Sequence, residues 1–235
     1  MVLNHPNLIT ATSLRPMNMS LAHGDTRDSL SNRRDFLEGL GIDYRDLVCA
    51  RQAHLSHVQY ISASDKGRGA LSEEDAFCNT DALITDNRRL PLAVFTADCL
   101  PVFLYDPKNQ GIGLVHAGWK GTKEKILTKT VLLMQELFST KTKDLLVGFG
   151  PSIRQCCYAV GREFFDFFSY GLTSRDGQLY LDLVGINKKE ALDLGVDKTN
   201  IFDSSVCTYC NPKEFFSFRR EGPSCGRMMS VIMLK

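Results

Sequence analysis

The sequence has no excess of charge of either sign. Its 28 lysine and arginine residues nearly balance its 27 aspartate and glutamate residues, and the basic residues are scattered along the chain. A protein that binds nucleic acid through phosphates needs a basic patch or stripe, which this distribution does not provide. We therefore expect no nucleic-acid partner, and small, locally recognised ligands are favoured instead.

Long apolar runs are also missing. No run approaches the roughly 20 apolar residues that a membrane-spanning helix needs, so we expect no membrane partner. Residues 1–6 lack the charged and apolar regions of a secretory signal, which predicts a cytoplasmic protein. The eight cysteines are spread over a large chain that is 43% hydrophobic, and such a core does not need disulfides. We therefore expect free thiols.

Three familiar nucleotide and hydrolase motifs are absent. The chain has no Gly-x-Gly-x-x-Gly, no Gly-x-x-x-x-Gly-Lys-Ser/Thr and no Gly-x-Ser-x-Gly in the required context. Dinucleotide-binding, P-loop and α/β-hydrolase interpretations are therefore excluded. No linker, internal repeat or low-complexity tract divides the chain, so residues 1–235 are predicted to form a single domain.

Hydrophobic patterning predicts a mixed α/β protein without the regular strand–helix alternation of a Rossmann fold. The predicted strands are residues 8–14, 47–51, 58–61, 80–85, 92–96, 102–105, 112–115, 145–149, 180–183, 200–206, 215–219 and 228–234. The predicted helices are residues 28–40 with Gly41 as the stop, 122–138 with Thr122 as the N-cap, 162–169 and 185–194. Residues 66–79 are polar and expected to form a loop.

One cysteine and one histidine lie at the ends of neighbouring predicted strands. Cys99 lies between the strands at 92–96 and 102–105, and His116 follows the strand at 112–115. Side chains at strand ends point into a cleft whose shape the rigid sheet maintains. The imidazole could therefore deprotonate the thiol, or both side chains could bind one metal ion. The alternative is that Cys99 is a small buried apolar residue, as most free cysteines are.

Two further patterns carry ligand-type residues. His54 and His57 would share one face of a helix, but residues 58–61 favour extended chain, so only one of them can easily face the site. Cys207-Thr208-Tyr209-Cys210 is a lone C-x-x-C. Without a second such pair, and without a strand–helix context, it only weakly indicates a zinc or redox role.

Several motifs, in one order, resemble those of the YfiH family. They are Gln52-Ala53-His54, 97–101, 116–121, 150–153, Cys207-Thr208, 215–220 and Gly226-Arg227. The resemblance runs from about Thr10 to Leu234. Members of this laccase-domain family were long labelled multicopper polyphenol oxidases and are more recently described as zinc-containing purine nucleoside phosphorylases.

The resemblance implies a fold of two packed mixed sheets flanked by helices in four layers, related to the cysteine-hydrolase fold of cytotoxic necrotizing factor toxins. It places metal-binding and catalytic positions on His54, Cys99 and His116, and substrate-binding positions on Arg15 and Asn18. The chain departs from the family near these last two residues. The glycine-rich loop between them is nearly gone, and Leu14 replaces a threonine.

The oxidase label can be tested by counting histidines. A mononuclear copper plus a trinuclear copper cluster needs on the order of ten histidines, because imidazole is the main copper ligand. This chain has five histidines, so it cannot form both copper sites alone, although it could bind Cu²⁺. Three protein ligands with an open fourth position are instead the pattern of catalytic Zn²⁺.

The resemblance therefore implies a zinc-dependent purine nucleoside phosphorylase that also deaminates adenosine. Its expected partners are phosphate and the nucleosides adenosine, inosine, guanosine and S-methyl-5′-thioadenosine. The charged candidates for phosphate binding are Arg15, Arg51, Arg219, Arg220 and Arg227. The alternatives are a metal-free cysteine hydrolase or amidase, for example one that edits peptidoglycan precursors, a copper-dependent polyphenol oxidase, and a zinc-stabilised binding module. The sequence does not indicate an oligomeric state.

Overall fold

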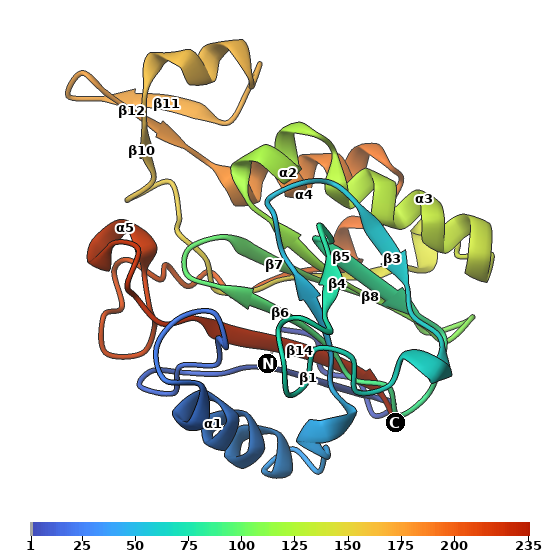
Figure 1. The fold of residues 1–235 in the computed structure, drawn as a ribbon. Coiled ribbons are helices and arrows are strands. Elements are labelled where there is room, and N and C mark those ends of the chain that lie inside the picture. The colour runs from blue at the N-terminus through green and yellow to red at the C-terminus, as the bar shows by residue number, and fades with distance from the viewer. Residues whose placement is uncertain (1) are drawn as a thin grey trace.

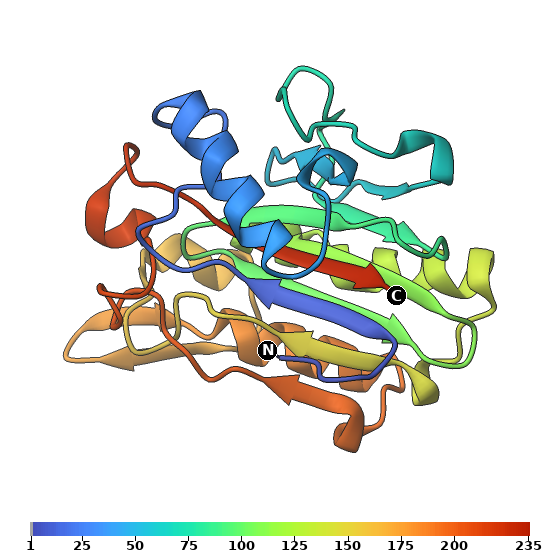
Figure 2. The ribbon, with the colours of Figure 1, turned by 90° about the horizontal axis from the view of Figure 1, so that it is seen from below.

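Two mixed β-sheets form the centre of the computed structural model, which describes residues 2–235 (Figure 1). The strands of the larger sheet are β3 (Val58–Tyr60), β5 (Ala82–Thr85), β7 (Leu100–Asp106), β8 (Gly111–Ala117), β9 (Leu146–Phe149) and β13 (Ile201–Asp203). Those of the smaller sheet are β1 (Leu8–Thr12), β2 (Val48–Arg51), β4 (Phe77–Cys78), β6 (Leu92–Thr96) and β14 (Met228–Leu234). The strand orders are β13-β9-β7-β8-β5-β3 and β1-β14-β6-β2-β4, so the first and last strands of the chain pair (Figure 2).

The larger sheet is buried on both faces. In β7 the side chains of Val102 and Leu104 join one hydrophobic cluster, and those of Phe103 and Tyr105 join another. The second cluster also contains side chains of the smaller sheet, such as Val94, so it lies between the sheets. Strands covered on both sides are apolar at every position, which explains the continuous apolar runs in this part of the sequence.

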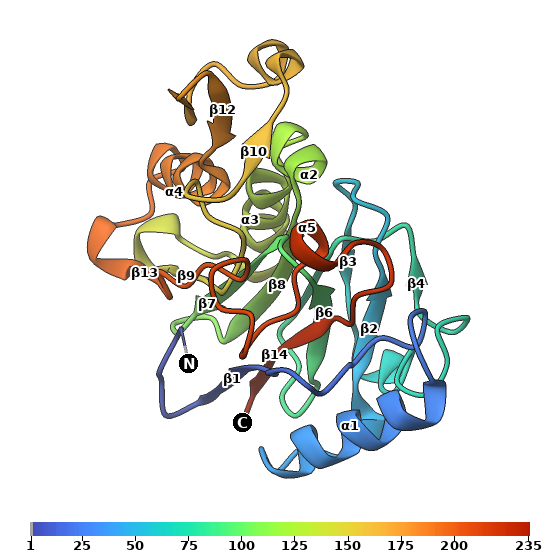
Figure 3. The same cartoon turned by 90° about the vertical axis from the view of Figure 1, so that its left-hand side faces the viewer.

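Helices cover the two outer faces (Figure 3). Helix α1 (Thr26–Glu38) packs on the smaller sheet, where Leu37 joins a cluster with Ala93 and Val231. Helices α2 (Trp119–Lys123), α3 (Ile126–Phe138) and α4 (Leu183–Asp193) lie on the side of the larger sheet. The molecule is therefore mixed α/β in four layers, as predicted. No helix among residues 2–235 combines the length and the apolar character that a bilayer crossing needs.

A small third sheet projects from this body at the top of Figure 1. It consists of β10 (Ala159–Val160), β11 (Leu172–Arg175) and β12 (Gln178–Leu181), in the order β10-β12-β11. Most residues of β11 are exposed, so the sequence offered no apolar pattern from which to predict it. The helix predicted at 162–169 is a shorter 3₁₀ segment, Arg162–Asp166.

Two other local predictions were wrong. Residues 215–219 are not a strand, because Ser217 caps the short helix α5 (Phe218–Glu221). Thr122 is not an N-cap, because α2 starts after Gly118 and a left-handed Lys125, with φ of 61°, separates it from α3. Gly41 stops helix α1 as predicted, because it has φ of 74° and its N–H donates to the Glu38 carbonyl, while the Ile42 N–H donates to the Leu37 carbonyl.

Candidate functional site

Cys99 lies where the chain crosses from one sheet to the other. Strand β6 belongs to the smaller sheet and β7 to the larger one, and residues 97–99 connect them. Asp98 in this link has φ of 89°, a conformation that costs free energy in a residue other than glycine. Its carboxylate accepts hydrogen bonds from the Thr208 and Ser217 hydroxyls at 2.6 and 2.9 Å and from the Arg219 backbone N–H at 2.7 Å. These contacts hold the strained link in place.

His116 reaches the same point from the neighbouring strand. The register of β7 and β8 pairs Pro101 with His116, so the imidazole lies beside Cys99, and only 2% of it is exposed. Its Nδ1 lies 2.7 Å from Asp81 Oδ1. An ionised carboxylate only accepts hydrogen bonds, so Nδ1 donates and Nε2 is left to face the site.

Asp81 also anchors the third residue of the centre. Its carboxylate accepts the backbone N–H groups of Ala53, His54 and Leu55 at 3.2, 3.0 and 2.8 Å. These bonds fix His54 in a left-handed conformation, with φ of 57° and its ring centroid 4.8 Å from that of His116. His57 is exposed and does not line the cavity described below, which confirms that only one of the two histidines faces the site.

The three predicted ligand residues come together. Ligand atoms of His54, Cys99 and His116 all lie within 4.8 Å of one another. Gly118 leaves space for this approach, because a Cβ atom there would lie 3.1 Å from both Cys99 Sγ and His54 Cδ2. Two imidazoles and one thiolate, with one imidazole oriented by a carboxylate, form a donor set that fits a catalytic divalent ion of the zinc class.

Electrostatics favour the charged forms of Cys99, His116 and Asp81. Burial raises the pKa of the Cys99 thiol, but His116 and hydrogen bonds from both histidines outweigh it and lower that pKa to about 6. Burial lowers the pKa of His116, but the Cys99 thiolate and Asp81 raise it to about 9. Burial also raises the pKa of Asp81, and its hydrogen bond with His116 reverses the shift, so that the pKa falls. Without metal, the three groups form a thiolate–imidazolium–carboxylate arrangement that suits nucleophilic chemistry.

A cavity of about 510 Å³ opens beside the three ligand residues. Aromatic and cationic side chains both line it, among them Phe95, Trp119, Tyr158, Arg51, Arg219 and Arg227. Three of the five arginines predicted as anion-binding candidates therefore reach the cavity. Arg15 and Arg220 instead form ion pairs with Glu221 at 3.1 and 2.6 Å.

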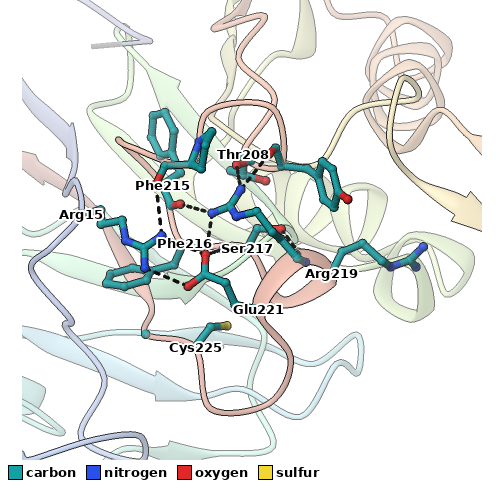
Figure 4. Close-up of polar contacts among 12 residues, drawn as sticks. Arg15, Thr208, Phe215, Phe216, Ser217, Arg219, Glu221 and Cys225 are labelled. Atoms are coloured by element: carbon teal, nitrogen blue, oxygen red, sulfur yellow. Dashed lines mark hydrogen bonds and ion pairs between the residues drawn. The ribbon is translucent and has the colours of Figure 1, made fainter.

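The two predicted substrate residues, Arg15 and Asn18, lie outside the cavity lining. Arg15 forms two hydrogen bonds of 3.1 Å with Glu221 and lies over the Phe216 ring (Figure 4). Asn18 Oδ1 accepts the backbone N–H groups of Ser20 and Arg227 at 3.2 and 2.9 Å, and both of these residues line the cavity. Neither Arg15 nor Asn18 lines it directly, and their substrate-binding roles stay predictions.

Sequence reasoning did not single out Asp81, Tyr158 or His23. Asp81 was visible only as part of a predicted strand leading toward the Cys99–His116 pair. Tyr158 and His23 line the cavity from connecting segments, and such segments gave no pattern that separated them from ordinary loop residues.

Known proteins resemble this chain in sequence and in fold. The family model described as multi-copper polyphenol oxidoreductase laccase matches residues 9–235. The purine nucleoside phosphorylase YlmD of Geobacillus stearothermophilus is 35% identical over 92% of this chain and 82% of the relative. The adenosine deaminase RL5 of an unknown prokaryotic organism is 33% identical over 83% of this chain and 78% of the relative. The crystal structure of YlmD from G. stearothermophilus superposes with a TM-score of 0.94, at 31% identity, over 98% of this chain and 93% of that one.

Proposed function

The chain belongs to the multi-copper polyphenol oxidoreductase laccase family, and from that premise we propose that it is a purine nucleoside phosphorylase with adenosine deaminase activity. The observation that carries the proposal is one His/Cys/His donor set beside a cavity with aromatic and cationic walls. Cavities of roughly 300–1,000 Å³ accommodate small organic ligands, so a nucleoside fits this one. The proposed substrates are adenosine, inosine, guanosine and S-methyl-5′-thioadenosine.

We assign the resident ion as Zn²⁺, with Cu²⁺ as a second ion that the same donors accept. His54, Cys99 and His116 would hold it, and three protein ligands leave one position open. An ion bound there supplies Lewis-acid activation of water at neutral pH. Asp81 keeps the His116 ring in the tautomer that presents Nε2.

For phosphorolysis, a phosphate oxygen bonds to ribose C1′ while the bond from C1′ to the purine nitrogen breaks and the base leaves with the electron pair. Arg51, Arg219 and Arg227 supply positive charge for the phosphate from the cavity wall. Trp119 offers an aromatic face for the purine. Burial raises the pKa of Tyr158, so its phenol stays protonated and can donate a hydrogen bond.

For deamination, water adds to C6 of adenosine and the amino group leaves as ammonia, giving inosine. This reaction consumes no phosphate. The two activities are therefore separable by omitting phosphate from the assay, although both depend on the same three ligand residues.

A second candidate function is favoured by one observation, the chain of contacts from Cys99 through His116 to Asp81. In a metal-free protein this would be a nucleophile, a base and an orienting carboxylate, as in cysteine hydrolases and amidases. A thiolate bound to zinc is a poor free nucleophile, so chelation separates the two functions.

The deciding experiment incubates purified protein with adenosine, with and without phosphate, before and after zinc removal. We expect adenine and ribose 1-phosphate only with phosphate, inosine in both cases, and loss of deamination on zinc removal with recovery on zinc addition. His54→Ala should lose activity by roughly two to four orders of magnitude. The matched control His57→Ala should retain it, because His57 is exposed and outside the cavity.

Two results together would support the hydrolase and reject the phosphorylase: the metal-stripped protein hydrolyses an amide and is blocked by thiol alkylation, and the zinc-loaded protein turns over no nucleoside.

A further inference from the structure

Four cysteines form a second cluster away from the His/Cys/His donor set. Cys156 and Cys157 lie in the loop between β9 and β10, and Cys207 and Cys210 follow β13. All four sulfurs lie within 4.8 Å of one another. Cys210 Sγ is 3.8 Å from Cys156 Sγ and 3.3 Å from Cys157 Sγ. The C-x-x-C pair of the sequence therefore has a partner, which is a Cys-Cys pair rather than a second C-x-x-C.

The spacing of these sulfurs is that of ligands around an ion. A tetrahedral zinc with Zn–S bonds of about 2.3 Å places its sulfurs about 3.8 Å apart. A disulfide would require about 2.05 Å, and all eight cysteines of the chain are free. We propose that Cys156, Cys157, Cys207 and Cys210 bind a second divalent ion of the zinc class. Four thiolates leave no open position, so the site is structural.

The surroundings of the cluster suit a negatively charged centre. Four thiolates and one divalent ion carry two net negative charges, and three arginines attach to the same segments. Arg175 donates to the Cys156 carbonyl at 3.1 Å, Arg154 to the Val206 carbonyl at 3.1 Å, and Arg220 to the Tyr209 carbonyl at 2.8 Å. Outer contacts of this kind orient ligands and offset their charge.

The ion would join two segments that build the wall of the cavity. Tyr158, which lines the cavity, directly follows Cys157. Thr208 directly follows Cys207 and donates to Asp98, the residue before Cys99. An isolated bridge between Ser152 and Cys207 also joins these segments, and Arg154 forms an ion pair with Asp203 at 2.8 Å. The proposed site therefore has a positioning role.

Metal content of the reduced, purified protein tests the proposal. We expect about two zinc ions per chain in wild type and about one in the double variant Cys157→Ser/Cys210→Ser. The control Cys78→Ser should keep both ions, because Cys78 is an exposed thiol outside both clusters. Cys99→Ala should lose the other ion and keep this one, so failure here is distinguishable from failure of the proposed function.

Two further measurements keep the test decisive if the double variant does not fold. Cobalt(II) bound to Cys99→Ala should show the charge-transfer absorption of several thiolate ligands. In wild type, alkylation of the four thiols should be slow until a chelator is added. Equal metal content in wild type and a folded double variant would overturn the proposal. So would a Cys157–Cys210 disulfide in freshly purified protein that holds about one ion per chain.

Discussion

The Asp81 carboxylate holds both histidines of the proposed metal centre. It accepts the Nδ1–H of His116 and three backbone N–H groups from residues 53–55. The carboxylate is fully buried, and so many donors compensate for the loss of its hydration. One side chain therefore sets the tautomer of one ligand and the loop conformation of another.

We predict that Asp81→Asn weakens zinc binding by roughly 10- to 100-fold, because the amide removes the charge that orients and polarises the His116 ring. Nucleoside turnover at limiting zinc should fall in parallel. Zinc competition against a fluorescent chelator measures the affinity, and circular dichroism checks the fold. Asp86→Asn is the matched control, since Asp86 is exposed and accepts hydrogen bonds from the Tyr60 hydroxyl and the Asn87 amide. Equal zinc affinity in Asp81→Asn and wild type would contradict the assigned role.

The thiol of Cys99 supplies a second prediction at this scale. Because its folded pKa is lowered to about 6, the thiolate is present above that pH and is lost as the pH falls through it. In zinc-stripped protein, alkylation of Cys99 should therefore rise around pH 6 and level off, whereas an ordinary thiol rises around pH 8.5. Mass spectrometry of the labelled peptides measures this rate. Cys49 is the internal control, because burial raises its pKa to about 11. A Cys99 profile centred near pH 8.5 would refute the pairing with His116.

Residue types at strand ends were enough to predict Cys99 and His116 as neighbours, whereas His54 was assigned from the resemblance to the family. The role of Asp81 could not be predicted, because it depends on two tertiary contacts. Strand β5 pairs with β8, and the backbone of residues 53–55 folds back to donate hydrogen bonds to the Asp81 carboxylate. The five candidate arginines were equivalent by charge. Tertiary contacts separated them, since Glu221 engages Arg15 and Arg220.

At the scale of elements, the short helix α5 gives two adjacent arginines different surroundings. Arg219 lines the cavity, with its guanidinium 5.3 Å from the centroid of the Tyr158 ring. Arg220 donates to the backbone carbonyls of Thr208 and Phe215 and to Glu221. Figure 4 shows Arg219 directed away from the cluster around Glu221.

We predict that Arg219→Gln raises the KM for phosphate about tenfold or more with little change in Tm, because it removes a charge-assisted contact from the cavity wall. Arg220→Gln should instead lower the free energy of unfolding by roughly 1–3 kcal/mol, because four acceptors lose their donor. Steady-state kinetics at varied phosphate and urea unfolding measure the two effects. Each variant is the control for the other. An unchanged KM for phosphate in Arg219→Gln together with a raised KM in Arg220→Gln would reject Arg219 as a phosphate ligand.

The central strands were the most predictable elements. Strands such as β6, β8 and β14 are buried on both faces and so leave apolar runs in the sequence. Phe215 to Phe218 has the β-propensity of a strand, but the Ser217 hydroxyl accepts the Arg220 N–H and donates to Asp98, which turns the chain into α5. Tertiary contacts of this kind override local propensity.

On the scale of the whole molecule, the proposed centre spans the two sheets. His54 follows β2 of the smaller sheet, His116 belongs to β8 of the larger one, and Cys99 lies on the connection between them. Neither sheet alone contains the donor set. The strain at Asp98 and His54 is located at this junction, where the packed sheets and the Asp81 carboxylate compensate for it.

An ion bound at this junction would therefore cross-link the sheets and stabilise the fold. Zinc that binds only the folded state contributes about 2.7 kcal/mol at 100 times its Kd, which raises the Tm of a chain of this size by roughly 5–10 °C. We predict this rise in zinc-stripped Cys157→Ser/Cys210→Ser, in which the second cluster no longer contributes. Adding His54→Ala should abolish most of the rise, because it removes a ligand that joins the smaller sheet to the ion. Adding His57→Ala should leave the rise intact, since His57 is exposed. Differential scanning calorimetry over a zinc titration measures these shifts, and equal shifts in the two histidine variants would refute a centre that joins the sheets.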